Sequence, residues 1–410
     1  MTTACTVEEA YAAYQACRAR KRTSATCIDY EHDLTGNLCS TVRAINGHRW
    51  RPDSHMCFVV LNPKPREVWA STFRDRVVHH IVYRRLRHRF EPRWIATSFA
   101  CIEGRGTGAG LQWAQRAARS VTAGWTRPAW VLQLDIDTFF PTIDRAQILA
   151  MLLERVDEPW LARLCEQIIH IDVTDNAHLP GNPYLLSLIP AHKSLWHAPH
   201  GKGLPIGNLT SQFAANVLLD VLDQRAVREG WAAHYGRYVD DMLLMDVSAD
   251  RLVNAQGRVE EALADLGLRL APTKTRLARV EAGFDFCGVW VLPHRTYQRR
   301  STVRRGMRAM RDLDGSERSA ASVTARFASA RRVDGWRLRG ALSRRAVQSG
   351  LQVDEDRTRC AVREADDDDG EGRGRPGSAG RGPRRDAPDQ PAGAGTAGLA
   401  VGQGSASAVD

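Results

Sequence analysis

Lysine is scarce in this 410-residue sequence. Arginine supplies nearly all of the 57 basic residues, and the five lysines are Lys21, Lys64, Lys193, Lys202 and Lys274. The formal net charge is +10, and such a balance favours a polyanionic partner because each neutralised phosphate releases condensed counterions. The arginine skew also fits an arginine-rich gene composition, so charge alone does not identify a nucleic-acid-binding protein.

Several common signals are missing as well. The nine cysteines form no C-x-x-C pair and no Cys/His spacing typical of a zinc site. Their odd number predicts reduced thiols, as in a cytoplasmic protein. No run approaches the roughly 20 apolar residues of a membrane helix, and the N-terminus has no apolar segment long enough for a signal peptide. The sequence therefore predicts a cytoplasmic protein without a membrane partner.

The first third of the chain reads as helices around a short strand. Residues 1–55 are polar and helix-rich, and a strand is predicted at Met56–Leu61. Apolar residues at helical spacing predict a helix over Arg74–Phe90. Four glycines between positions 104 and 110 predict a flexible loop that carries Arg105.

The middle of the chain alternates strands and helices. Trp130–Leu134 is an apolar run of buried-strand character, and residues 145–170 are helical. Residues 172–203 are a Pro/Gly/His-rich connection, after which a helix is expected to begin near Asn208 or Thr210. Residues 236–247 predict a β-hairpin with its turn at Asp240-Asp241. The later elements are an amphipathic helix over Leu252–Leu266 and a strand over Phe284–Leu292.

The C-terminal part changes character. From Thr302 to Leu342 the pattern is helical and strongly basic. After about Gln348 the sequence is rich in Gly, Pro, Ser and Ala, carries the acidic run Asp366–Asp369, and has few large apolar residues. Such a composition buries too little apolar surface to offset chain entropy, so residues 348–410 are predicted to be a disordered tail.

Three aspartates stand where a pair of metal ions can be held. Asp135 ends the apolar run, and Asp240-Asp241 forms the tip of the hairpin. Phosphoryl transfer to a growing 3′-end uses two divalent cations roughly 3.5–4 Å apart, and such cations take oxygen ligands. Aspartate is also common in ordinary turns. The usual two-residue hairpin turn has Gly second, however, and adjacent carboxylates repel each other unless a cation screens them. Taken alone, the Asp-Asp pair still fits an ordinary turn better than a metal site, and the motifs around it decide between the two.

Five motifs in order resemble those of reverse transcriptases. Residues 134–140 (LDIDTFF) are similar to the first palm motif, and residues 238–241 (YVDD) are similar to the hairpin motif. The other three are residues 203–212 (GLPIGNLTSQ), 267–275 (GLRLAPTKT) and 286–289 (FCGV). The resemblance implies an α+β right-hand polymerase with fingers, a palm built on a ferredoxin-like antiparallel sheet, and a helical thumb.

The resemblance also divides the chain into parts. It implies fingers at residues 56–130, a palm at 131–293 with a fingers-like insertion at 145–205, and a thumb at 294–347. Residues 1–55 are then a helical N-terminal extension, and residues 348–410 are the tail. The basic segment from Arg299 to Arg345 fits a thumb that grips a template–primer duplex through its phosphates.

The same resemblance implies roles at the carboxylates. Asp135, Asp240 and Asp241, with the carbonyl of Ile136, would hold two Mg²⁺ ions, for which Mn²⁺ can substitute. Lys274 would protonate the pyrophosphate leaving group, because lysine can be tuned to release a proton and arginine cannot. Asp137 shares the strand face of Asp135, but its family counterpart is often basic, so no catalytic role is assigned to it.

Seven residues are candidates for binding the incoming nucleotide. Phe140 falls at the position that blocks a ribose 2′-OH in the family, although a core aromatic is the alternative. Ile206 stands where many accurate relatives carry a glutamine-like side chain, and an aliphatic group cannot make the hydrogen bonds that monitor base-pair position. The remaining candidates are Gly207, Gln212 and three basic residues that would hold the triphosphate, Lys64, Arg66 and Arg105.

Within the family, the nearest likeness is to reverse transcriptases of diversity-generating retroelements. It is carried by residues 206–212 (IGNLTSQ), 73–80 (FRDRVVHH) and 192–195 (HKSL). It implies cDNA synthesis from a structured template RNA, with primer and deoxynucleoside triphosphates as partners, frequent errors opposite adenine, and a small basic accessory protein. A retron-like or phage-defence reverse transcriptase shares the chemistry. A catalytically silent RNA-binding scaffold is the non-enzymatic alternative, and the three carboxylates count against it.

Overall fold

The computed structural model describes residues 4–19, 21–61 and 64–311, together with Gly340, Arg344 and two short strands within residues 351–362. The chain forms two compact units that meet in sequence between Arg295 and Thr296. Helices α1 to α11 and strands β1 to β9 belong to the first unit, which contains all of the candidate site residues. None of the described helices combines the length and the apolarity of a membrane span.

Three helices precede the first strand and pack on a fourth. They are α1 (Val7–Arg18), α2 (Ala25–His32) and α3 (Leu34–Asn46), and the fourth is α4 (Phe73–Phe90). The α1 helix begins with a capping box, in which the Thr6 side chain accepts from the Glu9 amide and Glu9 accepts from the Thr6 amide. Aromatic rings pack between α1 and α4: the ring centroids of Tyr14 in α1 and Phe73 in α4 are 6.4 Å apart. The helix predicted over Arg74–Phe90 is confirmed.

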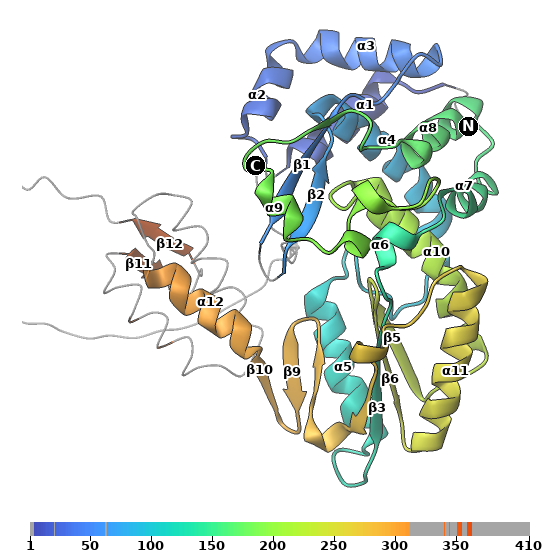
Figure 1. The fold of residues 1–410 in the computed structure, drawn as a ribbon, viewed down its shortest axis with the longest axis vertical. Helices are drawn as coiled ribbons and strands as arrows, with labels where there is room; N and C mark the ends of the chain where they lie inside the picture. Colours follow the sequence, from blue (N-terminus) through green and yellow to red (C-terminus); the bar gives the residue numbers. More distant parts are fainter. Residues whose placement is uncertain are drawn as a thin grey trace, which may run out of the picture. The chain divides into compact units, whose positions relative to one another are not determined.

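A three-stranded sheet lies below these helices (Figure 1). Its strands are β1 (His55–Val60), β2 (Arg66–Ala70) and β4 (Ala177–His178), in the order β2-β1-β4. β1 and β2 are antiparallel, whereas β4 joins β1 in parallel. Because β4 and the short helix α9 (Tyr184–Ser187) both lie within residues 172–203, that predicted connection has structure of its own and adds a strand to the β1–β2 hairpin.

A four-stranded sheet forms the lower half of the first unit. Its strands are β3 (Trp130–Asp135), β5 (His234–Tyr238), β6 (Asp241–Asp246) and β7 (Arg276–Arg279), in the order β5-β6-β3-β7. Alternate side chains point to opposite faces of a strand, and both faces are covered here. Helices α10 (Leu209–Arg228) and α11 (Ala249–Asp265) pack on one face, and α5 (Thr107–Val121) packs on the other (Figure 1).

The remaining helices of the first unit connect these layers. They are α6 (Phe139–Thr142), α7 (Arg145–Leu153) and α8 (Pro159–His170). The helix expected near Asn208 or Thr210 is α10, which begins at Leu209 with Asn208 as its N-cap. Its early residues include Thr210 and Ser211, both buried, so the 203–212 motif runs from a loop directly into the core.

Two predicted elements need correction. The glycine-rich loop ends at Gly106, and Gly108 and Gly110 lie in the first turn of α5, because apolar residues at helical spacing extend that helix back to Thr107. A Cβ at Gly110 would lie 3.0 Å from the Cys287 Sγ, so this glycine serves close packing. The strand predicted over 284–292 is a hairpin of two strands, β8 (Phe284–Phe286) and β9 (Val289–Leu292). Cys287 (φ 52°) and Gly288 (φ 81°) take left-handed conformations and turn the chain between them.

The second unit is described only in part. It contains β10 (Arg295–Gln298), most of which lies beyond the boundary, and the arginine-rich helix α12 (Arg300–Arg311). Strands β11 (Leu351–Asp354) and β12 (Arg359–Val362) form an antiparallel pair inside the segment predicted to be disordered. The alternating Leu351 and Val353 match a strand pattern despite their polar neighbours, and the boundary of the tail at 348 stays a prediction. Most of the predicted thumb, and the tail after Val362, lie outside the described residues.

Candidate active site

Two of the predicted carboxylates lie opposite each other on neighbouring strands of the four-stranded sheet. Asp135 closes β3, Asp241 opens β6, and the two residues form the last pair of the antiparallel ladder. Directly opposed residues have Cβ atoms roughly 4.5–5.5 Å apart and point to the same face. The ends of two strands therefore present a pair of carboxylates side by side.

The third carboxylate belongs to the turn between β5 and β6. Tyr238 pairs with Asp241, so Val239 and Asp240 are the two turn residues. The sequence placed this turn at Asp240-Asp241. The structure reverses the chain one residue earlier because Val239 adopts a left-handed conformation with φ 57°. For a residue with a Cβ that conformation costs on the order of 1–2 kcal/mol, so contacts nearby must hold it.

Charges around Asp240 set its proton affinity. Burial and the negative charge of Asp135 raise the pKa of the Asp240 carboxyl above its usual value, against the opposing effect of Lys274 and Arg66. Two carboxylates and two cationic groups therefore act on one another electrostatically here. A divalent cation between the carboxylates would relieve their repulsion.

Lys274 makes direct contact with this cluster. It ends a short 3-10 turn (Pro272–Lys274), and its Nζ donates to Asp135 Oδ1 in an ion pair. The segment before it is held against the end of β3, because the Ala271 amide donates to the Asp135 carbonyl over 2.8 Å. The residue proposed as general acid therefore lies at the carboxylates.

The backbone of Ile136 is oriented by the same segment. Ile136 forms an antiparallel bridge with Leu270. The hydrogen bonds of this bridge come from the residues on either side of Ile136: the Asp135 carbonyl accepts from the Ala271 amide, and the Asp137 amide donates to the Arg269 carbonyl. Alternate residues of a strand direct their backbone groups to opposite sides. The Ile136 carbonyl consequently points toward the β6 side, where Asp240 and Asp241 lie.

This donor set suits an open site for a hard divalent cation. Among the described residues, no group of three or more His, Cys, Asp or Glu side chains is placed to hold a metal ion, so the three aspartates do not form a complete metal centre by themselves. Mg²⁺ commonly takes one or two carboxylates from the protein and completes its octahedron with water and substrate phosphates. The Asp135–Asp241 pair, with Asp240 and a backbone carbonyl beside it, fits that manner of binding.

The structure brings Phe140 to the start of the 203–212 motif. Phe140 follows β3 in α6 and is partly buried, and its carbonyl accepts from the Leu204 amide over 2.9 Å. The Gly203 amide donates to the Ile143 carbonyl over 2.8 Å. Two motifs about sixty residues apart in sequence thus form one surface beside Asp135.

The same motif also docks on strand β2. The Trp69 amide donates to the Ile206 carbonyl over 2.7 Å, and Gly207 follows with φ 126°. A Cβ at Gly207 would lie 2.4 Å from the Trp69 carbonyl oxygen, so only glycine fits. Arg66, which influences the pKa of Asp240, begins this strand, and Gln212 lies in the first turn of α10.

Three other predicted or considered residues are placed differently. Arg105 donates through Nη1 to the carbonyls of Ile95 (2.6 Å) and Ser98 (2.9 Å), so its guanidinium fastens a loop of the protein and the triphosphate role loses its support. Lys64 is exposed just before β2. Asp137 forms an ion pair with Arg269 over 2.8 Å. This pairing explains the presence of a carboxylate at position 137 without a catalytic role.

Comparison with known proteins now decides the family. Residues 62–291, more than half of the chain, match the reverse transcriptase (RNA-dependent DNA polymerase) family. The chain belongs to the reverse transcriptase family.

Individual relatives are more distant. Protein YkfC of Escherichia coli (strain K12) is 25% identical over 281 residues, which cover 58% of this chain and 65% of that protein. Two solved structures are similar to this reverse transcriptase-family chain. Telomerase from Candida albicans, solved with the TWJ fragment of telomeric RNA, has 11% identity and a TM-score of 0.44 over 74% of this chain and 55% of its own. Apo telomerase from Candida tropicalis has 10% identity and a TM-score of 0.43 over 67% and 51%. The chain therefore spans less than two thirds of each of these relatives.

A buried polar cluster, which the sequence did not reveal, supports the 203–212 motif of this reverse transcriptase-family chain. Ser71 donates to the Asn208 Oδ1 over 2.7 Å, and His79 Nδ1 lies 2.7 Å from the Thr210 hydroxyl oxygen. Segments 73–80 and 206–212 thus touch each other. Sequence reading singled out both segments, but nothing in it paired them.

His79 of this cluster and its neighbour His80 predict a pH-dependent stability. Burial lowers the pKa of His79 to about 3 and that of His80 to about 4, far below the roughly 6.5 of an exposed histidine. Between the folded and the unfolded pKa values, the unfolded chain binds protons that the folded chain does not bind. The free energy of unfolding is therefore greatest above pH 6.5 and decreases as the pH drops. Near pH 5.5 each histidine contributes a slope of about 1.4 kcal/mol per pH unit.

Urea unfolding between pH 6.5 and 5 measures that slope. We expect His79→Gln to remove about half of the two-histidine contribution, whereas His178→Gln, at an exposed position, leaves the slope unchanged. Equal slopes in all three proteins would contradict the assignment to the buried histidines.

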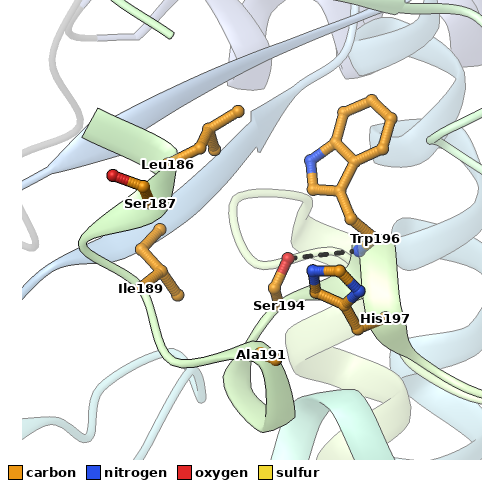
Figure 2. Close-up of a pocket in the computed structure, with 7 residues that line it drawn as sticks. All are labelled: Leu186, Ser187, Ile189, Ala191, Ser194, Trp196 and His197. Atoms are coloured by element: carbon orange, nitrogen blue, oxygen red, sulfur yellow. Dashed lines mark hydrogen bonds between the residues drawn. The ribbon is translucent and has the colours of Figure 1, made fainter. Parts of the chain in front are cut away.

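A separate pocket of about 400 Å³ lies in the segment before the 203–212 motif (Figure 2). Its lining residues are Leu186, Ser187, Ile189, Ala191, Ser194, Trp196 and His197. The segment is anchored to β2, because the Ser194 hydroxyl donates to Glu67 over 2.9 Å and the rings of Trp69 and Trp196 lie 5.5 Å apart. No candidate active-site residue lines this pocket, and we assign it no role.

Proposed function

We propose that this chain is an RNA-directed DNA polymerase that extends a 3′-end with deoxynucleotides while copying an RNA template. Membership of the reverse transcriptase family supports the reaction. The observation that carries it to this site is the pairing of Asp135 with Asp241 beside the Asp240 turn. Two strand ends and a turn would supply the oxygen ligands that two-metal nucleotidyl transfer uses.

The proposed chemistry assigns each residue a task. Two Mg²⁺ ions, for which Mn²⁺ can substitute, supply Lewis acidity at the transferred phosphate when bound. Asp135, Asp240 and Asp241, with the Ile136 carbonyl, are the residues that would hold them. Lys274, whose Nζ donates to Asp135, would protonate the departing pyrophosphate. Arg66, whose charge lowers the pKa of Asp240, would attract the triphosphate.

The proposed architecture follows the right-hand plan. The sheet β5-β6-β3-β7 would be the palm, and the sheet β2-β1-β4 with its helices would be the fingers. The attachment of β4 to β1 supports grouping the 145–205 insertion with the fingers. Helix α12 would begin the thumb.

Primer extension tests the proposal. The full-length protein is given an RNA template, an annealed DNA primer, Mg²⁺ and deoxynucleotides, and we expect products whose sequence is complementary to the template. Absence of extension, even after addition of RNA and small proteins encoded beside the gene, would overturn the proposal in favour of an RNA-binding scaffold.

The finer proposal is a diversity-generating enzyme that miscopies adenines, working in the cytoplasm with a small basic accessory protein. Its support is the 206–212 and 73–80 segments and the hydrogen bond between them. The alternative, a retron-like or phage-defence enzyme, uses the same site and differs in its template. Errors spread evenly over the four template bases would favour that alternative.

Ile206 gives this finer proposal a direct test. We expect Ile206→Gln to lower misincorporation opposite template adenine at least about threefold, because each added hydrogen bond to the base pair is worth about 1 kcal/mol. Ile206→Val is the matched control and keeps an aliphatic side chain. Deep sequencing of the cDNA reads out both, and unchanged adenine errors in Ile206→Gln would rule out the role of this side chain.

A further inference from the structure

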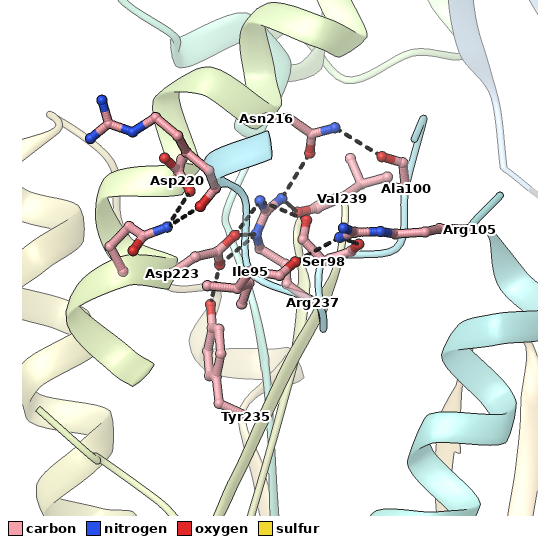
Figure 3. Close-up of polar contacts among 12 residues, drawn as sticks. Ile95, Ser98, Ala100, Arg105, Asn216, Asp220, Asp223, Tyr235, Arg237 and Val239 are labelled. Carbon is pink, nitrogen blue, oxygen red and sulfur yellow. Dashed lines mark hydrogen bonds and ion pairs between the residues drawn. The ribbon is translucent and has the colours of Figure 1, made fainter. Parts of the chain in front are cut away.

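A fully buried ion pair lies behind the Asp240 turn. Arg237 of β5 and Asp223 of α10 are each 1% exposed. The Arg237 Nε donates to Asp223 Oδ1 over 2.9 Å, and Nη2 donates to Oδ2 over 2.6 Å, so the pair is bidentate (Figure 3). The Tyr235 hydroxyl donates to the same carboxylate over 2.7 Å. This geometry fixes the plane of the guanidinium.

The fixed guanidinium directs its other donors at three separate parts of the chain. Nη1 donates to the Asn216 Oδ1 (3.2 Å) and to the Val239 carbonyl (2.8 Å), and Nη2 donates to the Ser98 hydroxyl (3.2 Å). A guanidinium has five N–H groups, and all five are used here. A lysine at this position has three donors at a single point and cannot reach all of these acceptors together.

One of these acceptors belongs to the candidate active site. Val239 is the turn residue with φ 57°, and Asp240 follows it directly. A β-branched residue seldom adopts this conformation, and it relaxes to ordinary extended backbone unless its surroundings hold it. The direction of the Val239 carbonyl sets the path by which the chain enters Asp240. The hydrogen bond from Arg237 therefore acts on the residue that aims the carboxylate.

The same guanidinium connects the turn to the nucleotide side of the site. Asn216 lies four residues after Gln212 on α10, which places it one helical turn deeper on the same face. Asn216 also donates to the Ala100 carbonyl over 2.8 Å. The helix that begins with the 203–212 motif and the turn that carries Asp240 are thus tied through one side chain.

We propose that Arg237 is a positioning residue: its hydrogen bond to the Val239 carbonyl holds Val239 in the left-handed conformation and so places Asp240 beside the Asp135–Asp241 pair. Asp223 neutralises the charge of the guanidinium, whose plane is held also by its hydrogen bonds to Asn216, Val239 and Ser98. The inference rests on the proposed function only for the identity of the reaction, because the placement of a metal-binding carboxylate can be measured without catalysis.

The test compares Arg237→Lys with Asp223→Asn. Arg237→Lys keeps a positive charge opposite Asp223 but cannot also hold Val239, whereas Asp223→Asn weakens the buried pair and leaves the bond to Val239 available. Mn²⁺ binding is followed by electron paramagnetic resonance, alongside primer extension and melting temperature. We expect Arg237→Lys to weaken Mn²⁺ binding at least about tenfold and to lower kcat by a similar factor with KM for the primer–template little changed. We expect Asp223→Asn to melt earlier yet bind Mn²⁺ within about threefold of wild type.

A rescue separates positioning from general stability. Glycine adopts positive φ at no steric cost, so adding Val239→Gly to Arg237→Lys is expected to restore at least about a third of the lost Mn²⁺ affinity. If Arg237→Lys does not fold, Arg237→Met with Asp223→Leu replaces it, because removing both charges leaves none buried and unpaired. A folded Arg237 variant that binds Mn²⁺ as wild type does, or a defect that Val239→Gly leaves untouched, would overturn the inference. A wild-type chain that binds Mn²⁺ but extends no primer counts against the proposed function instead, and the Mn²⁺ comparison still decides the role of Arg237.

Discussion

Asp240→Asn is expected to abolish nucleotide incorporation and to leave the protein at least as stable as wild type. The amide keeps the size of the carboxylate but lacks the charge that draws a divalent cation, and loss of several kcal/mol of metal-based stabilisation corresponds to at least about 10³-fold in rate. Stability should move the other way. Burial and the charge of Asp135 raise the pKa of Asp240, so its ionised form is unfavourable in the folded chain at neutral pH, and the neutral amide relieves that cost.

Single-turnover incorporation and thermal melting check both halves of this expectation. Asp250→Asn is the matched control, since Asp250 is exposed in the first turn of α11 and should change neither quantity. Retention of more than about a tenth of the wild-type rate in Asp240→Asn would contradict the proposed metal ligand. A large fall in melting temperature would show that the loss of activity reflects unfolding.

Gly207→Ala is expected to have the second largest effect. The added Cβ would meet the Trp69 carbonyl oxygen at 2.4 Å, and the backbone at φ 126° is one that alanine rarely adopts. Strand β2 and the 203–212 motif must then separate, which shifts Ile206 and Arg66 relative to the carboxylates. Misplacement of about 1 Å near reacting groups costs roughly 10²-fold, so we expect a loss of that order in kcat/KM for deoxynucleotides.

Gly181→Ala is the control that introduces backbone strain at a positive φ without the steric clash expected at Gly207. Gly181 also has a positive φ, at 96°, but a Cβ there meets nothing within 4 Å. We expect this control to lose a little stability and to keep its activity. Steady-state kinetics on both variants decides the matter, and equal activities would show that the contact between β2 and the 203–212 motif does not position the nucleotide.

Much of the site was predictable because its signals are local. An apolar run followed by Asp135, and a hairpin pattern around Asp240-Asp241, depend on neighbouring residues alone. The turn was predicted one residue too late, because the left-handed conformation of Val239 depends on a buried contact and not on valine's own preference. The Gly104–Gly110 segment favours a loop by its local composition because glycine weakens a helix, whereas the apolar residues that follow at helical spacing extend α5 back to Thr107.

The contacts that hold the site together could not be predicted. Ser71 and Asn208 are 137 residues apart, and Ser98 and Arg237 are 139 residues apart. No local period or spacing links such pairs. A buried arginine such as Arg237 therefore cannot be told from the sequence apart from an exposed arginine in a strand. Arg105 shows the converse: its glycine-rich setting suggested a phosphate contact, whereas its guanidinium is used to fasten residues 95–98.

Iron-mediated cleavage tests the central claim most directly, because it locates the cation without requiring catalysis. Fe²⁺ bound in place of Mg²⁺ reduces added hydrogen peroxide to hydroxide and a hydroxyl radical, ascorbate returns the iron to Fe²⁺, and the radicals cut the backbone near the metal. We predict cuts at the end of β3, near Asp135, and at the β5–β6 turn, near Asp240, both competed by Mg²⁺ and lost in Asp240→Asn. Cleavage confined to another acidic segment, such as Asp366–Asp369, with neither strand end cut, would contradict the assignment of the catalytic site.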